Sequence, residues 1–133
     1  MKGTAVLIDT SIWIEYFRGK DRVLGEVVSH LIDTQRARLC GVVLAELLSG
    51  TPRPPDRDEL EENLDALQYL EVSRSTWVLL GQMTQEMRRR GTRIPFTDMV
   101  ISALAIENGA EVYTTDSHFQ SVPGLHLFES QGP

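Results

Sequence analysis

Apolar residues recur along the chain with two different periods, and the change of period predicts where strands and helices lie. The run of residues 5–8, Ala-Val-Leu-Ile, is continuously apolar, which is typical of a short strand buried on both faces. After Asp9 the apolar positions follow helical spacing as far as Gly19, and a second helical stripe covers residues 21–34. The pattern therefore predicts a buried strand followed by two helices.

The rest of the chain continues this alternation. Residues 37–41 predict a second buried strand, and residues 42–50 predict a helix that ends at Gly50. The prolines of TPRPPD predict a loop, after which regularly spaced leucines predict a helix over residues 56–70 that Asp56 caps. Further strands are predicted over residues 70–72, 111–116 and 126–128, and further helices over residues 75–90 and 97–109.

Buried strands that alternate with helices of this length indicate an α/β domain with a small, mainly parallel central sheet and predominant helix. The length of 133 residues is typical of one domain, and no internal repeat, linker or low-complexity segment interrupts it. We therefore expect a single domain over residues 1–129 and a C-terminal tail over residues 130–133.

The composition, with 41% hydrophobic and 24% charged residues, is typical of a globular protein. The single cysteine, Cys40, excludes an internal disulfide and a cysteine-ligated metal site, and it suits a reducing cytoplasm. No run approaches the roughly 18 to 20 apolar residues of a membrane span, and the beginning of the chain lacks the long apolar core of a signal peptide. We expect a cytoplasmic protein that does not enter a membrane.

The formal net charge of −6 and the pI of about 5.0 exclude a global positive field that would attract nucleic acid. Any contact with nucleic acid must therefore be local. Local basic groups do occur, at Arg88, Arg89, Arg90, Arg93 and, in the proline-rich segment, Arg53.

Four acidic residues occupy positions where chemistry is common in α/β proteins. Asp9 and Asp116 each follow a predicted strand, and ligands bind at the carboxyl edge of such sheets. Asp98 lies in the first turn of the helix that leads to the strand before Asp116, and Glu46 has no obvious solvent face on a helical wheel. Each aspartate alone is equally explained as a turn residue, a helix cap or a partner of the helix dipole.

Together the four carboxylates predict a metal site. Two like charges about 4 Å apart repel by roughly 4 kcal/mol at an effective dielectric constant of 20, so such a cluster must hold protons or bind cations. Mg²⁺ and Mn²⁺ are the cations that an all-carboxylate site binds best. Such a site suggests phosphoryl chemistry, because the cation activates water and offsets charge on phosphate. The hydroxyls of Ser11, Thr114 and Thr115 are candidates to orient a carboxylate or a water.

The segments LIDTSIWI, VVLAELLSG and IPFTDMVISALAIENGAEVYTTDSHF resemble, in this order, the PIN domain, and in particular the VapC-type ribonuclease toxins of toxin–antitoxin pairs. The resemblance covers essentially the whole chain. By motif it carries the family's acidic cluster to Asp9, Glu46, Asp98 and Asp116. It implies an αβα sandwich, Mg²⁺- or Mn²⁺-dependent endonucleolytic cleavage of RNA, a homodimer, and inhibition by a cognate VapB-type antitoxin that can place an arginine in the acidic site.

One position departs from the family's pattern. Many relatives have a further acidic residue two positions after the fourth carboxylate, where this chain has His118. The departure removes a carboxylate that a second metal ion would use, and the sequence favours a turn residue over a metal ligand at His118. The arginines at 53, 88, 89, 90 and 93 are candidates for RNA phosphate contacts, although short charge runs at a helix end are commonly just solvated.

Other protein classes with an acidic pocket fit less well. A phosphate-accepting receiver module needs adjacent carboxylates after the first strand and a late lysine, whereas this chain has lysine only at Lys2 and Lys20. A haloacid-dehalogenase-like phosphatase needs a second aspartate where Ser11 stands. A PIN-like module that binds RNA or protein without cutting stays open as an alternative, although the presence of all four carboxylates argues against it.

Overall fold

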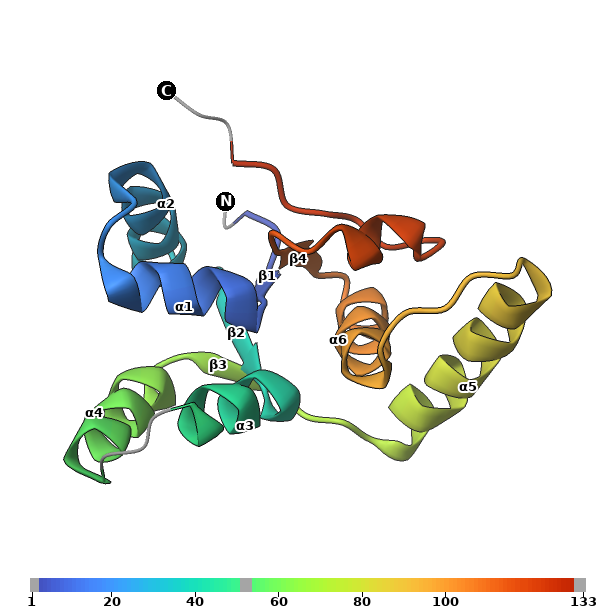
Figure 1. The fold of residues 1–133 in the computed structure, drawn as a ribbon, viewed down its shortest axis with the longest axis horizontal. Helices are drawn as coiled ribbons and strands as arrows, with labels where there is room; N and C mark the ends of the chain where they lie inside the picture. The colour runs from blue at the N-terminus through green and yellow to red at the C-terminus, as the bar shows by residue number, and fades with distance from the viewer. Residues whose placement is uncertain (1–2, 51–53, 131–133) are drawn as a thin grey trace.

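The structure is a computed structural model that describes residues 3–50 and 54–130 (Figure 1). Arg53 and most of the predicted tail lie outside the described residues. In chain order the elements are β1 (Val6–Ile8), α1 (Thr10–Arg18), α2 (Arg22–Asp33), β2 (Ala37–Cys40), α3 (Gly41–Ser49), α4 (Pro54–Asp65), β3 (Gln68–Leu70), α5 (Arg74–Arg89), α6 (Phe96–Glu107), β4 (Glu111–Tyr113) and the 3-10 helix η1 (Ser117–Ser121).

The strands form one parallel sheet in the order β3-β2-β1-β4. The first strand is central, and its three residues, Val6, Leu7 and Ile8, are fully buried, as their continuous apolar run predicts. Figure 1 shows α1 and α2 on one side of the sheet and α5 and α6 on the other. The predicted α/β sandwich with a small parallel sheet is thus confirmed.

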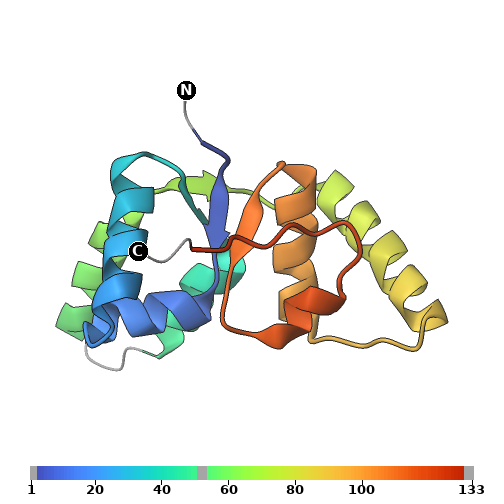
Figure 2. The same ribbon diagram turned by 90° about the horizontal axis from the view of Figure 1, so that it is seen from above.

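Parallel strands place all their carboxyl ends on one edge, and this edge positions the site. Figure 2 shows the ends of β1 and β4, the beginnings of α1 and α6, and η1 gathered along it. The C-terminal end of α5 reaches the same side of the molecule, because the segment after it returns to the beginning of α6 (Figure 2). Residues far apart in the sequence are therefore neighbours here.

The predictions for the middle of the chain are wrong in part. The helix begins at Pro54 instead of Asp56, since a proline in the first turn loses no helical hydrogen bond. It also ends at Asp65, and residues 68–70, predicted as helix, form β3 by pairing with β2. The leucine spacing fits helix and strand alike over so short a stretch, and tertiary pairing decides between them.

The predictions for the last strands are also too long. The strand predicted over residues 111–116 ends at Tyr113, and the chain turns into η1 with Asp116 at its N-cap. The strand predicted over residues 126–128 is reduced to a single parallel bridge between Val112 and Leu127. In the part of the chain that the structure describes, no helix has the length and apolar character needed to cross a membrane.

Candidate active site

The register of the sheet brings Asp9 next to the segment that follows β4. Ile8 is paired with Tyr113, and the Asp9 backbone N–H donates a hydrogen bond to the Tyr113 carbonyl at 2.9 Å. The chain leaves the sheet at the end of each of these two strands: it enters α1 after Asp9 and a turn after Tyr113. The residues at positions 9 and 114 thereby become neighbours across 105 positions of sequence.

Asp9 is held by two hydroxyl groups. Its side chain is nearly buried, with 6% exposed, and Oδ2 accepts hydrogen bonds from Ser11 Oγ at 2.9 Å and Thr114 Oγ1 at 2.7 Å. The carboxylate does not cap α1, so the capping explanation of this residue does not hold. Both hydroxyls bind the same oxygen, which leaves Oδ1 without a hydrogen-bond donor among the described residues.

The same hydroxyls fix the turn that carries Asp116. The Asp116 backbone N–H donates to Thr114 Oγ1 at 2.9 Å, and the Thr115 backbone N–H donates to Ser11 Oγ at 3.2 Å. Ser11 and Thr114 thus contact both the carboxylate of Asp9 and the backbone of the turn. Thr115 contributes its backbone to this network, whereas its sequence position had suggested a role for its hydroxyl.

Asp98 and Asp116 meet at His118. Asp98 extends from the first turn of α6 with 13% of its side chain exposed, and Asp116 caps η1 by accepting the His118 backbone N–H at 2.9 Å. The His118 Nδ1 lies 3.3 Å from Asp98 Oδ2 and 3.1 Å from Asp116 Oδ1. His118 is therefore a turn residue, as the sequence predicted, and its ring also contacts two carboxylates.

The pKa of the Asp98 carboxyl is shifted by its burial and by the neighbouring charges of this cluster. Burial raises the pKa of its carboxyl above the ordinary value; the His118 hydrogen bond opposes this shift, and the charges of Asp116 and Asp9 add to it. The influence of both aspartates on Asp98 shows that the three carboxylates share one field. Such a field attracts cations, in line with the metal site that the four carboxylates predict.

Glu46 lies on α3, beside the three aspartates, and its exposure to solvent differs from the prediction. It is exposed, since α3 buries Val43 and Leu47 and turns Glu46 to solvent, so the expectation that it lacks a solvent face is wrong. The carboxylate is tied to the site by Thr10, whose Oγ1 donates to Glu46 Oε1 at 2.7 Å. The position of Thr10 directly after Asp9 was the only sequence signal for this contact.

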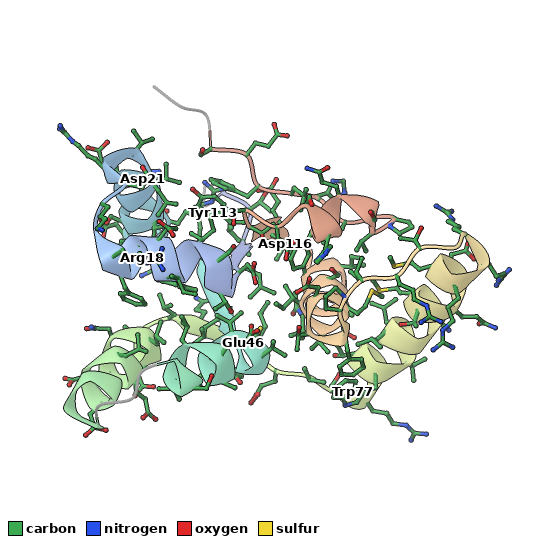
Figure 3. The ribbon with its side chains drawn as sticks, viewed as in Figure 1. Arg18, Asp21, Glu46, Trp77, Tyr113 and Asp116 are labelled. Carbon is green, nitrogen blue, oxygen red and sulfur yellow. The ribbon has the colours of Figure 1, made fainter. Side chains whose placement is uncertain are left out.

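The buried thiol of Cys40 lies near both Asp9 and Glu46. Burial raises the pKa of Cys40, backbone hydrogen bonds from α3 oppose this, and the charges of Asp9 and Glu46 both raise it further. Figure 3 shows Glu46 on α3 and Asp116 beyond the end of β4, with the beginning of α1 between them. The four predicted carboxylates therefore line one edge, with Glu46 at its exposed end.

The arginine run divides into two pairs. Arg89 and Arg90 form surface ion pairs with Glu86, at 3.6 and 3.2 Å. Arg88 and Arg93 instead line a cavity of about 240 Å³ between the end of α5 and the beginning of α6, which Phe96 also borders. Phe96 is 63% exposed and precedes Asp98 by two positions, so this cavity lies at the beginning of the helix that carries Asp98.

A large cavity lies away from the carboxylates, between α1, α2 and α4. It has a volume of about 920 Å³, and Trp13, Tyr16 and Phe17 of α1 contribute to its lining. Trp13 and Phe17 are stacked at 5.8 Å, and Phe17 remains 44% exposed. The buried Trp13 Nε1 has no hydrogen-bond partner within residues 3–50 and 54–130.

The donor atoms at the acidic edge suit a divalent cation. One atom each from Asp98, Asp116 and His118 lie within 4.8 Å of one another. Asp9 is joined to Asp116 through Thr114, which donates to Asp9 Oδ2 and accepts the Asp116 backbone N–H. Carboxylate oxygens are the ligands that Mg²⁺ and Mn²⁺ prefer. The residues present therefore fit the divalent metal that the acidic cluster implies.

Comparisons with known proteins agree with this geometry. The sequence model of the PIN domain matches residues 6–125. A VapC ribonuclease of Mycobacterium bovis is 31% identical over 121 residues, which are 88% of this chain and 90% of that protein. The tRNA(fMet)-specific endonuclease VapC of Salmonella typhimurium is 25% identical over 91% of this chain and 94% of its own length.

The fold is also found in solved structures. The DNA-bound VapBC of Salmonella typhimurium includes a chain that superposes with a TM-score of 0.82 at 22% identity, covering 95% of this chain and 98% of that one. A chain of VapBC2 from Rickettsia felis, bound to a promoter DNA fragment, gives a TM-score of 0.81 at 21% identity, with 93% and 97% covered. The architecture of the present chain is shared over nearly its whole length.

Proposed function

Because the chain belongs to the PIN-domain family and is related to VapC ribonucleases, we propose that it is an endoribonuclease toxin that a cognate VapB-type antitoxin neutralises. The observation that carries the proposal is the acidic edge: Asp98 and Asp116 offer donor atoms within 4.8 Å of each other, Asp9 is joined to Asp116 through Thr114, and Glu46 stands at the exposed end, so their charges form one negative field. A protein that only binds RNA gains nothing from such a field, because it repels phosphate in the absence of a cation.

We propose Asp9, Asp98 and Asp116 as the residues that hold a divalent cation, Mg²⁺ or Mn²⁺. A bound cation would supply the Lewis acid that activates water for attack on a phosphodiester and offsets the charge that develops on the phosphate. The chain orients one of its ligands in advance. Ser11 and Thr114 hold Oδ2 of Asp9 by two hydrogen bonds and so leave the other oxygen, Oδ1, free for the cation.

Glu46 is placed for a different task from the aspartates. Its Oε1 is occupied by the Thr10 hydroxyl, while the rest of the carboxylate is exposed at the end of the site. We assign to its Oε2 the acceptance of a proton from the attacking water. Because Thr10 follows Asp9 directly, this hydrogen bond keeps the proton acceptor and the Asp9 carboxylate in a fixed relation.

The RNA backbone needs cationic partners next to an acidic edge in a protein of net charge −6. We propose Arg88 and Arg93 for this role, because both border the cavity beside Phe96 and neither forms an ion pair with an acidic side chain among the described residues. Arg89 and Arg90 are already paired with Glu86 and contribute less. Phe96 offers an exposed ring on which a base can stack.

The antitoxin requires an apolar surface as well as the acidic site. We place an apolar antitoxin segment in the cavity between α1, α2 and α4, where Phe17 is exposed beside the other aromatic side chains of α1. An arginine of the same antitoxin, inserted among the carboxylates, would compete with the cation for the same negative charge.

The experiment that tests this function is cleavage of total cellular RNA by antitoxin-free protein with Mn²⁺, with Mg²⁺ and with EDTA. We expect discrete fragments from the wild type with metal and none from Asp98→Asn, while Asp33→Asn, an exposed aspartate at the end of α2, cleaves like the wild type. Cleavage by Asp98→Asn would assign the activity to a contaminant. Folded wild type that cleaves nothing but binds RNA would instead support the non-cutting alternative.

A further inference from the structure

His118 is the residue of the acidic edge that the proposed function leaves without a role. It stands two positions after Asp116, and its ring nitrogen Nδ1 faces both Asp116 Oδ1, at 3.1 Å, and Asp98 Oδ2, at 3.3 Å. The rest of the side chain is half exposed, so burial does not force the ring into this place. A contact with two carboxylates at once calls for a chemical explanation.

The three atoms have the separations of neighbouring metal ligands. With metal–ligand bonds of about 2.1 Å, adjacent ligand atoms of an octahedral site lie about 3 Å apart. The two distances from Nδ1 are close to this value, and all three atoms lie within 4.8 Å of one another. A cation between them therefore requires only small side-chain rotations.

The backbone holds the nitrogen in this position. Asp116 accepts the His118 backbone N–H at 2.9 Å, and this turn directs both side chains to the same side. The Asp116 backbone is itself bonded to Thr114, which also binds Asp9. The imidazole is thus attached to the same hydrogen-bond network as the carboxylates.

We propose that His118 Nδ1 is a ligand of the divalent cation, so that Asp98, Asp116 and His118 offer it two oxygens and one nitrogen. Imidazole suits transition metals, whereas Mg²⁺ prefers oxygen ligands. The site consequently selects Mn²⁺ over Mg²⁺ more strongly than an all-carboxylate site would. The inference rests on the proposed function only in that both use the same cation.

Pulsed electron paramagnetic resonance of Mn²⁺ bound to antitoxin-free protein tests the nitrogen directly, without any measurement of cleavage. We expect a ¹⁴N coupling typical of a ligated imidazole in the wild type, its loss in His118→Ala, and its retention in His126→Ala, which changes an exposed histidine outside the cluster. Circular dichroism confirms that each variant is folded. A wild type without the coupling, or a His118→Ala variant that keeps it, overturns the inference.

Competition between the two cations gives a second, quantitative test. We expect the ratio of the Mg²⁺ and Mn²⁺ dissociation constants to fall by about tenfold in His118→Asp, which replaces nitrogen by oxygen. An unchanged ratio contradicts nitrogen ligation. Protein that cleaves RNA with metal and Asp98 but shows no nitrogen coupling refutes this inference alone, whereas a coupling in protein that cleaves no RNA refutes the proposed function alone.

Discussion

Replacing Asp98 by asparagine should stabilise the metal-free protein, although the same change abolishes the proposed activity. The carboxylate atoms of Asp98 and Asp116 lie within 4.8 Å, where two unit charges repel by about 3.5 kcal/mol at an effective dielectric constant of 20. Because 37% of the Asp116 side chain is exposed, screening reduces this repulsion to about 2 kcal/mol. Asparagine keeps the size of the side chain and removes the repulsion.

An opposing contribution comes from the helix that carries Asp98. A carboxylate in the first turn of α6 is stabilised by the helix dipole, which is worth about 0.3 to 1 kcal/mol. The net gain of Asp98→Asn is then about 1 to 2 kcal/mol, or about 4 to 7 °C in melting temperature for a domain of this size. The measurement is calorimetric melting in EDTA at pH 8, well above the ordinary pKa of an aspartate carboxyl.

The dependence on pH has a definite sign. Folding raises the pKa of Asp98 above its ordinary value of 3.8, mainly through burial, so the folded state holds this proton more firmly than the unfolded chain. The stability of the wild type therefore falls as the pH rises through the interval between the two pKa values, and the full penalty is present above it. The advantage of Asp98→Asn should vanish below this interval and be complete at pH 8.

Divalent metal should reverse the order of the two proteins. Saturating Mn²⁺ binds the folded wild type and raises its stability by about 2.7 kcal/mol at a hundredfold excess over the dissociation constant. Asp98→Asn loses most of this gain, and Asp33→Asn should follow the wild type within about 0.5 kcal/mol in both buffers. An Asp98→Asn variant that melts below the wild type in EDTA would refute the shared field of the carboxylates.

Two further predictions test the surfaces assigned to RNA and antitoxin. Joint Arg88→Ala and Arg93→Ala substitutions should weaken RNA binding and reduce the dependence of the logarithm of affinity on log[salt] by about 0.7 per arginine, measured on an Asp98→Asn background. The control Arg22→Ala, at an exposed pair with Glu26, should leave both unchanged, and an equal effect there would contradict the assignment. Phe17→Asp should weaken antitoxin binding at least about tenfold, since it puts a charge into an apolar contact, and leave RNA cleavage unchanged. The control is Val78→Asp on the exposed face of α5, which should leave the antitoxin affinity, measured by calorimetry, unchanged. An equal loss of affinity in Phe17→Asp and Val78→Asp would exclude the cavity as the antitoxin site.

The sequence predicts those parts of the fold that follow from local burial. Val6, Leu7 and Ile8 have no polar neighbour to interrupt them, so only a strand buried on both faces accommodates the run, and the structure buries all three completely. The run over residues 68–70 is different, because its apolar spacing suits a helix continuing from α4 and a strand pairing with β2. Pairing partners lie far away in the sequence, and local pattern contains no information about them.

The same distinction explains what the sequence showed of the site. Asp9 and Asp116 were predictable because each follows a predicted strand, and parallel strands bring their carboxyl ends to one edge of the sheet. The contacts of Thr10 with Glu46 and of His118 with two carboxylates depend on side-chain positions that only the assembled edge defines. The general position of a cation site thus follows from topology, whereas its ligand chemistry depends on a turn of a few residues. A substitution such as histidine for an acidic residue at position 118 can therefore alter metal preference while the fold and the remaining carboxylates stay in place.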